Sequence, residues 1–275
     1  YIGELTMEQV IVLGTGNAQA LDCYNTCFAL KEGNEYLLVD TGGGNGILKQ
    51  LNKQNIPLNQ IHHIFITHEH TDHILGIPWM IRFIGSLMNQ NKYEGNLYVY
   101  CHSDLVNTIR TIVELIVQKK FCKFDDRMFL VPLQDGDTKE ILGNQITFFD
   151  IKSTKAKQYG FYFIQPNGDK ITFTGDEPYR KAIQEYVKGS SWLFHEAFCL
   201  YSQREIFKPY EKYHGTVKDA CQLAEELKIP NLLLWHTEDK NIPNRKTFYM
   251  EEGKHFYHGN LFIPNDGETI KLINQ

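Results

Sequence analysis

The sequence lacks an apolar run of about 18 residues, the length that a membrane-spanning helix requires. It also lacks an excess of basic residues, because 28 Lys and Arg stand against 33 Asp and Glu and give a net charge of −5. That balance disfavours broad electrostatic capture of nucleic acid. We therefore expect no membrane partner, and we disfavour nucleic acid as a partner.

The six cysteines form no Cys-x-x-Cys pair, and the chain is longer than the secreted domains that depend on a disulfide framework. No signal-peptide pattern opens the sequence. We expect free thiols in a reducing cytoplasm and predict a cytoplasmic protein. Residues 1–8 are interpreted as an N-terminal extension or an expression remnant, ahead of one domain over residues 9–275.

The most informative stretch that is present is Thr67–His73, which holds three imidazoles and two carboxylates in seven residues. The β-branched run His63–Ile66 before it predicts a buried strand, and residues 74–87 after it have helical spacing. Zinc and similar divalent metals favour imidazole with carboxylate. A solvated His-rich loop would explain an isolated His-x-His pair, but the strand and helix on either side favour a metal site.

Short apolar strands alternate with helical segments along the rest of the chain, without a repeat or a long linker. This alternation predicts a layered α/β (α+β) single domain with two central sheets. Gly14-x-Gly16 is too short for a dinucleotide-binding fingerprint, so the two glycines are interpreted as turn residues.

Several motifs together resemble the metallo-β-lactamase superfamily, and within it the ribonuclease Z branch. They are Leu13-Gly14-Thr15-Gly16, Val39-Asp40-Thr41-Gly42, His68-x-His70-x-Asp72-His73, Phe173-Thr174-Gly175-Asp176, His195-Glu196-Ala197, His214-Gly215-Thr216 and Leu234-Trp235-His236-Thr237. The resemblance implies an αββα metallo-β-lactamase sandwich that binds two divalent metal ions. It implies Asp72, His73, Asp176 and His236 as ligands at one position, and His68, His70 and Asp176 at the other.

The chain departs from that family in three places. The histidine that the family carries before a Tyr-Gly-Tyr-like strand is missing before Tyr159-Gly160-Phe161, so we expect a weaker second metal position, completed by Asp150, Ser153 or water. Only residues 165–169 stand where ribonuclease Z has an arm that grips transfer RNA, and residues 19–25 lack Lys and Arg. We therefore do not expect an efficient transfer RNA 3′-processing enzyme.

Four residues are predicted to be catalytic. Asp72 would ligate metal and help to position or deprotonate water, and His214 would donate a proton or a hydrogen bond to an anionic substrate. His195 and Glu196 would orient ligating imidazoles, although a hydrogen-bonded strand-end histidine is the alternative for His195. The three basic residues Lys152, Lys155 and Lys157 either form a solvated face or attract a phosphate group.

The sequence thus predicts a metal-dependent hydrolase that uses a metal-bound hydroxide on a small-molecule substrate. A phosphodiester is the preferred substrate, with ester, lactone or lactam cleavage as alternatives. Zinc is the expected metal, with manganese or iron also compatible. The rival hypothesis is a catalytically weak, metal-stabilised ligand-binding or regulatory protein of the same fold. A homodimer is compatible with either hypothesis.

Overall fold

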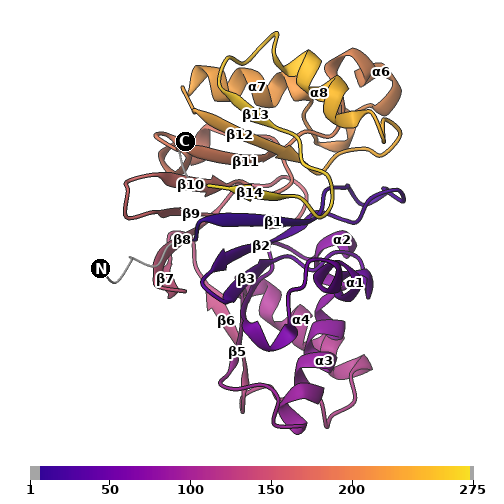
Figure 1. Ribbon diagram of the computed structural model, residues 1–275, viewed down its shortest axis with the longest axis vertical. Helices are drawn as coiled ribbons and strands as arrows, with labels where there is room; N and C mark the ends of the chain where they lie inside the picture. Colours follow the sequence, from indigo (N-terminus) through magenta and orange to yellow (C-terminus); the bar gives the residue numbers. More distant parts are fainter. Residues whose placement is uncertain (1–6, 273–275) are drawn as a thin grey trace.

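The computed structural model describes residues 7–272, and two seven-stranded sheets form its centre (Figure 1). Most of the predicted N-terminal extension, residues 1–6, and the last three residues of the predicted domain lie outside the described residues. The boundary predicted between residues 8 and 9 stays a prediction, although the first strand begins at Gln9.

The first sheet has the order β14-β1-β2-β3-β4-β5-β6. Its strands are β14 (Thr269–Lys271), β1 (Gln9–Gly14), β2 (Cys27–Glu32), β3 (Glu35–Val39), β4 (Ile61–Phe65), β5 (Leu97–His102) and β6 (Met128–Leu133). The strands from β14 to β3 pair antiparallel, and those from β3 to β6 pair parallel.

The second sheet has the order β13-β12-β11-β10-β9-β8-β7. Its strands are β13 (Asn260–Phe262), β12 (Asn231–Trp235), β11 (Trp192–Glu196), β10 (Lys170–Phe173), β9 (Tyr159–Ile164), β8 (Asn144–Asp150) and β7 (Thr138–Ile141). Here β10 to β13 pair parallel, and β7 to β10 pair antiparallel. Both sheets therefore contain a parallel half whose strands end at a common edge, the usual place for a site in such sheets.

Helices cover the outer face of each sheet (Figure 1). The first sheet carries α1 (Gly46–Lys53), α2 (Thr71–Ile74), α3 (Ile77–Asn89) and α4 (Val106–Ile116). The second carries α5 (Gln184–Val187), α7 (Val217–Glu226) and α8 (Arg245–Gly253), and α6 (Arg204–Phe207) lies near them. Short 3₁₀ turns are η1 (Leu58–Gln60), η2 (Ser103–Leu105), η3 (Lys181–Ile183), η4 (Tyr201–Gln203) and η5 (Tyr210–Lys212).

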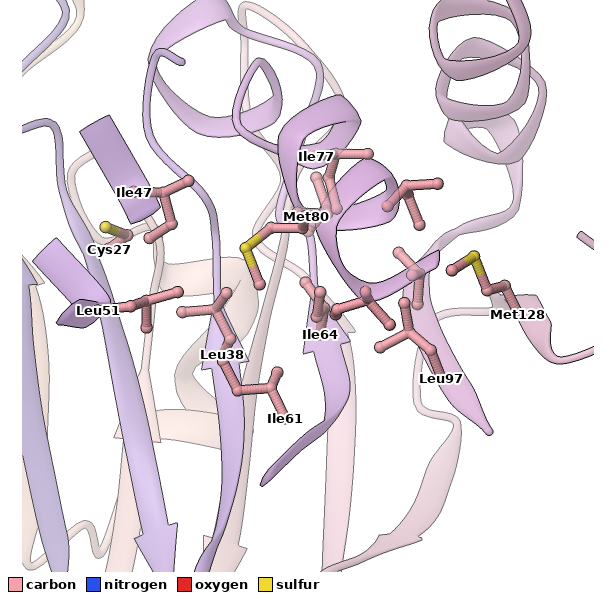
Figure 2. Close-up of a cluster of buried hydrophobic side chains, with 14 of the residues drawn as sticks. Cys27, Leu38, Ile47, Leu51, Ile61, Ile64, Ile77, Met80, Leu97 and Met128 are labelled. Carbon is pink, nitrogen blue, oxygen red and sulfur yellow. The ribbon is translucent and has the colours of Figure 1, made fainter. Parts of the chain in front are cut away.

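The central strands are buried on both faces, which explains their nearly continuous apolar sequences. In β1, Val10 and Val12 enter the core between the sheets, whereas Ile11 and Leu13 enter the core beneath the helices. The second of these cores joins Leu38 and Ile64 to Ile77 and Met80 of α3 (Figure 2). A third core lies between the second sheet and α5, α7 and α8. This layering confirms the predicted αββα sandwich.

Local details differ from the prediction where backbones approach closely. The helix predicted over residues 74–87 is divided at Gly76, where a Cβ atom would lie 2.1 Å from the backbone oxygen of Thr41. Ser103 begins a 3₁₀ turn ahead of α4 and makes no capping hydrogen bond. Thr216 does cap α7, in a capping box with Asp219. The short polar strand β7 was not predicted.

All six cysteines are free thiols, as predicted. Within residues 7–272, no helix combines the length and the apolar character that crossing a membrane requires. The cytoplasmic location stays a prediction.

Candidate functional site

The six predicted metal ligands meet at the edge where the parallel strands of both sheets end. The loop after β4 carries His68 and His70, and α2 follows with Asp72 and His73. From the second sheet, Asp176 follows β10 and His236 follows β12. All but the half-buried His70 are buried, so the fold places polar groups from distant segments in one enclosed spot.

The ligand atoms form two adjoining sets that share Asp176. In one set, His68 Nε2 lies 2.9 Å from His70 Nδ1 and 3.6 Å from Asp176 Oδ2. In the other set, Asp72 Oδ2 lies 3.2 Å from His73 Nε2 and 3.4 Å from His236 Nε2. Asp176 Oδ2 is 3.4 Å from His73 Nε2 and 3.5 Å from His236 Nε2, so it faces both sets.

This donor set fits divalent metal ions. The buried His73 Nε2 has no hydrogen-bond partner, and the ring nitrogens of His68 and His70 face each other, an arrangement that a shared cation would satisfy. Imidazole with carboxylate suits zinc and also manganese or iron. The predicted grouping of six residues into two sets is what the geometry shows; their role as ligands stays a prediction.

The charges within the cluster are suited to binding a cation. Burial opposes ionisation of Asp72 and Asp176, but the neighbouring histidines outweigh it and hold the pKa of both carboxyls well below the usual range. Burial keeps the pKa of His68 well below its ordinary value, which leaves a neutral imidazole. For His73, burial is outweighed by Asp72 and Asp40, which raise its pKa well above the ordinary value. A metal ion would displace that proton.

Two residues that the sequence interpretation did not assign, Asp40 and Thr67, support the ligating histidines from behind. His73 Nδ1 donates to Asp40 Oδ2 at 2.7 Å, which turns His73 Nε2 toward the cluster. Asp40 also accepts hydrogen bonds from the backbone nitrogen and the hydroxyl of Thr67, both at 2.8 Å. The Thr67 hydroxyl lies 2.8 Å from His68 Nδ1, so this one network orients both imidazoles. Asp40 belongs to the strand-end motif quoted above, and its φ of 58° marks an unusual backbone position.

Asp150 and Ser153, the residues expected to replace the missing histidine, make their hydrogen bonds outside the cluster. Asp150 accepts a hydrogen bond from the backbone nitrogen of Lys152, and Ser153 donates to Glu177. Gln158 is the residue that does reach the cluster, because its side-chain nitrogen donates to Asp176 Oδ1 at 2.5 Å. Sequence reasoning missed Gln158, whose position before a strand carries no distinctive signal.

A cavity of about 170 Å³ opens beside the cluster. Its walls hold Asn17, Ala18, Gln19, His70, Asp72, Lys155, Asp176, Phe198, Lys212, His214 and His236. His214 stacks on Phe198 with ring centroids 5.1 Å apart, and its Nδ1 lies 3.6 Å from Glu196 Oε2. The Nζ atom of Lys155 lies 3.5 Å from His214 Nε2. His214 and Glu196, predicted to be catalytic, are therefore adjacent, with His214 at the cavity wall.

The structure does not bring His195 into this cavity. One ring nitrogen of His195 lies 2.7 Å from the backbone oxygen of Glu196, and the other accepts a hydrogen bond from the backbone nitrogen of Tyr179 at 3.1 Å. Both nitrogens are thus used in holding local backbone. These contacts correspond to the strand-end alternative rather than to the expected orientation of metal ligands.

Comparisons with known proteins place these features in context. Residues 8–256 match the family model described as Anti-Pycsar protein Apyc1. A ribonuclease Z of Thermococcus sibiricus is 26% identical over 97% of this chain and 97% of its own length. Because such relatives carry the name of an RNA-cleaving enzyme, the comparisons do not support the expected absence of a nucleic-acid partner.

Two solved structures share the fold. The metallo-β-lactamase fold protein YhfI of Bacillus subtilis has a TM-score of 0.79 at 18% identity and covers 96% of this chain and 98% of its own. The short form of human tRNase Z has a TM-score of 0.72 at 20% identity and covers 97% of this chain and all of its own. These findings confirm the resemblance to the metallo-β-lactamase superfamily and its ribonuclease Z branch, and with the clustered side chains they support a metal-dependent hydrolase.

Proposed function

The chain belongs to the Anti-Pycsar protein Apyc1 family, and on that basis, together with the composition of its site, we propose that it hydrolyses a small phosphodiester with the help of divalent metal ions. The family name describes an anti-Pycsar protein, so action against a Pycsar system is the biological role that membership suggests. The relatives named ribonuclease Z agree with this proposal, because a ribonuclease cleaves the phosphodiester bonds of RNA.

The placement of two lysines at the cavity beside the metal-binding side chains carries the substrate proposal. Lys155 and Lys212 lie at the same cavity wall as His214, in a chain whose net charge is −5. Local positive charge in an otherwise acidic protein favours an anionic substrate. A phosphodiester carries such a charge, whereas a simple lactone or ester does not. The cavity of about 170 Å³ favours a small substrate.

Each group has a distinct role in this proposal. Metal ions, when bound, lower the pKa of water and stabilise negative charge on phosphoryl oxygens. Asp72, His73 and His236 hold one position, His68 and His70 hold the other, and Asp176 serves both. Asp40 and Thr67 fix the orientation of His73 and His68.

His214 is the proposed proton donor to the leaving oxygen. Phe198 supports one face of its ring, and Glu196 lies behind Nδ1. Glu196 is itself held, because the backbone nitrogen of Gly215 donates to its Oε1 at 2.6 Å. The other ring nitrogen of His214, Nε2, lies 3.5 Å from the Nζ atom of Lys155 at the cavity wall. An anionic leaving group would therefore meet both a proton donor and a fixed positive charge.

RNA is a second candidate substrate because the ribonuclease Z relative matches nearly the whole chain. The connection between β9 and β10 argues against a folded RNA, since it consists only of residues 165–169. A folded RNA requires many placed cations, one at each phosphate contact. We therefore propose that small phosphodiesters are cleaved in preference to precursor transfer RNA.

A substrate panel tests the proposed function. Protein loaded with zinc or manganese is offered bis-p-nitrophenyl phosphate, cyclic nucleotides, lactones, nitrocefin and precursor transfer RNA at physiological salt. We expect turnover of the small phosphodiesters and little of the others. Turnover of lactones or nitrocefin alone would refute the phosphodiester, and efficient cleavage of transfer RNA at its 3′ boundary would refute the preference for small substrates. A panel that stays silent while a ligand still binds would favour the rival binding protein.

A matched pair of lysine variants tests the anion site. Lys155→Met removes a charge from the cavity wall, and Lys157→Met removes one whose Nζ is bound to Asp104 at 2.8 Å instead. We expect Lys155→Met to raise KM for a small phosphodiester about tenfold, or about 1.4 kcal/mol of binding energy. Lys157→Met should leave KM unchanged. Equal effects of the two substitutions would show that only general electrostatic attraction is at work.

A further inference from the structure

Gln158 is the buried side chain that contacts the shared carboxylate of the two ligand sets. It precedes β9 directly and is 1% exposed. Its side-chain nitrogen donates to Asp176 Oδ1 at 2.5 Å, and its side-chain oxygen accepts from the backbone nitrogen of Asp176 at 2.8 Å. The same side-chain nitrogen lies 3.0 Å from His68 Nδ1. One amide thus contacts both the shared carboxylate and a neighbouring imidazole.

The surrounding backbone is shaped to admit this amide. Gly175 has a φ of +77°, and a Cβ atom at this position would lie 1.8 Å from Gln158 Oε1. Glycine adopts this backbone conformation readily and, because it has no side chain, leaves space for the amide of Gln158. On the other side, the backbone nitrogen of Ile151 donates to the backbone oxygen of Gln158 at 3.0 Å. Gln158 is therefore fixed at its backbone and at both side-chain polar atoms.

This contact gives the two oxygens of Asp176 different roles. Oδ1 accepts the hydrogen bond from Gln158. Oδ2 faces His68 at 3.6 Å, His73 at 3.4 Å and His236 at 3.5 Å. Oδ2 is therefore the oxygen that faces both sets, and the two positions share it.

The two positions are then unequal in protein ligands. One has Asp72, His73 and His236 in addition to the shared oxygen. The other has only His68 and His70 in addition to it, and no further His, Cys, Asp or Glu within the described part of the chain completes that set. A position with three ligands depends more heavily on each of them than one with four.

We propose that Gln158 is a positioning residue that holds Asp176 with Oδ2 turned toward both ligand sets, and that the metal centre would fill in order because the two sets are unequal. The position of Asp72, His73 and His236 fills first. The position of His68 and His70 fills last and exchanges its ion readily. Asp176 is one of only three ligands at the later position, so that position depends more heavily on the hydrogen bond from Gln158 than the other does.

Zinc titration of the metal-free full chain tests this inference, with a competing chromophoric chelator to give affinities and native mass spectrometry to count ions. We expect two zinc ions whose dissociation constants differ by about tenfold or more. Gln158→Leu should raise the weaker constant a further ten- to a hundredfold, the range for losing a residue that orients metal ligands, and should change the stronger one less.

Gln165→Leu is the matched control, because Gln165 is also buried and donates only to the backbone oxygen of Met7 through its side chain. It lies about 20 Å along β9 from Gln158, from the rise of a strand, and should bind both ions as the unchanged protein does. If Gln158→Leu does not fold, Gln158→Asn, which keeps the amide but shortens its reach, replaces it.

Equal affinities in the unchanged protein, or unchanged zinc affinities in a folded Gln158 variant, would overturn the inference. Loss of stability without loss of zinc affinity would also overturn it, since Gln158 would then be structural only. The measurement concerns metal affinity alone and does not rest on the identity of the substrate. A protein that cleaves no phosphodiester could still fill in this order.

Discussion

Replacement of Asp40 by Asn tests whether the residues behind the metal-binding cluster control its affinity for metal. Three donors converge on the Asp40 carboxylate: the backbone nitrogen and hydroxyl of Thr67, and Nδ1 of His73. An asparagine has the same shape but only one acceptor oxygen. In either orientation its NH₂ group faces at least one of these donors.

The expected cost has two parts. One buried donor left without an acceptor reduces the free energy of unfolding by about 1–3 kcal/mol. The loss of orientation at His73 should weaken metal binding at the position of Asp72, His73 and His236 by about ten- to a hundredfold. Denaturant unfolding of the metal-free protein measures the first part, and chelator competition measures the second.

Asp266→Asn is the control for this experiment. Asp266 also accepts hydrogen bonds from a hydroxyl and a backbone nitrogen, those of Thr15 and Tyr24, but it contacts none of the six predicted ligands. It should lose stability and keep its metal affinity. If Asp40→Asn binds metal as tightly as the unchanged protein, the reasoning about orientation is refuted, even where its stability falls.

Three further predictions concern stability and are measured by denaturant unfolding. Burial, with a smaller effect of His62, lowers the pKa of His63 to about 4. The contribution of His63 to stability is therefore complete above pH 6.5 and is lost as the pH falls toward 4. His63→Phe should reduce the loss of stability between pH 7 and 5 by about 1–2 kcal/mol, and an unchanged dependence of stability on pH would contradict this. Thr216→Ala should cost about 1 kcal/mol by breaking the capping box of α7, whereas Thr216→Ser should cost less; equal losses would argue against capping. Gly76→Ala should lower the free energy of unfolding by about 1–3 kcal/mol, because the new methyl group would clash with the backbone oxygen of Thr41. An unchanged stability would contradict this, because it would show that the backbone shifts without a penalty.

The sequence could predict the cluster because most of its ligands are close together in the chain. His68, His70, Asp72 and His73 lie within six residues, and their residue types already specify the chemistry. Asp176 and His236 are distant in sequence, but each follows a strand of the parallel half-sheet. Their place beside the histidine cluster was implied by the resemblance of the motifs that carry them, and the structure adds that parallel strands bring both residues to one edge.

The supporting residues could not be found in this way. Asp40 and Gln158 contact their partners across 33 and 90 residues of sequence, and an Asp or Gln beside a strand end is ordinary in turns. The division of the predicted helix at Gly76 has the same origin, because the approach of Thr41 is visible only once both sheets and helices are assembled. Local pattern indicates which side chains carry chemistry, and tertiary packing decides which side chains hold them in place.

Metal add-back to chelator-treated protein tests the central claim most directly. The protein is stripped of metal, zinc or manganese is returned stepwise, and hydrolysis of bis-p-nitrophenyl phosphate is followed beside the number of ions bound. We predict no turnover without metal, turnover that rises as ions bind, and none at any metal concentration in a folded Asp72→Ala variant. Phosphodiester turnover that persists in the metal-free protein, or a fully loaded protein that leaves every small phosphodiester intact, would contradict the account.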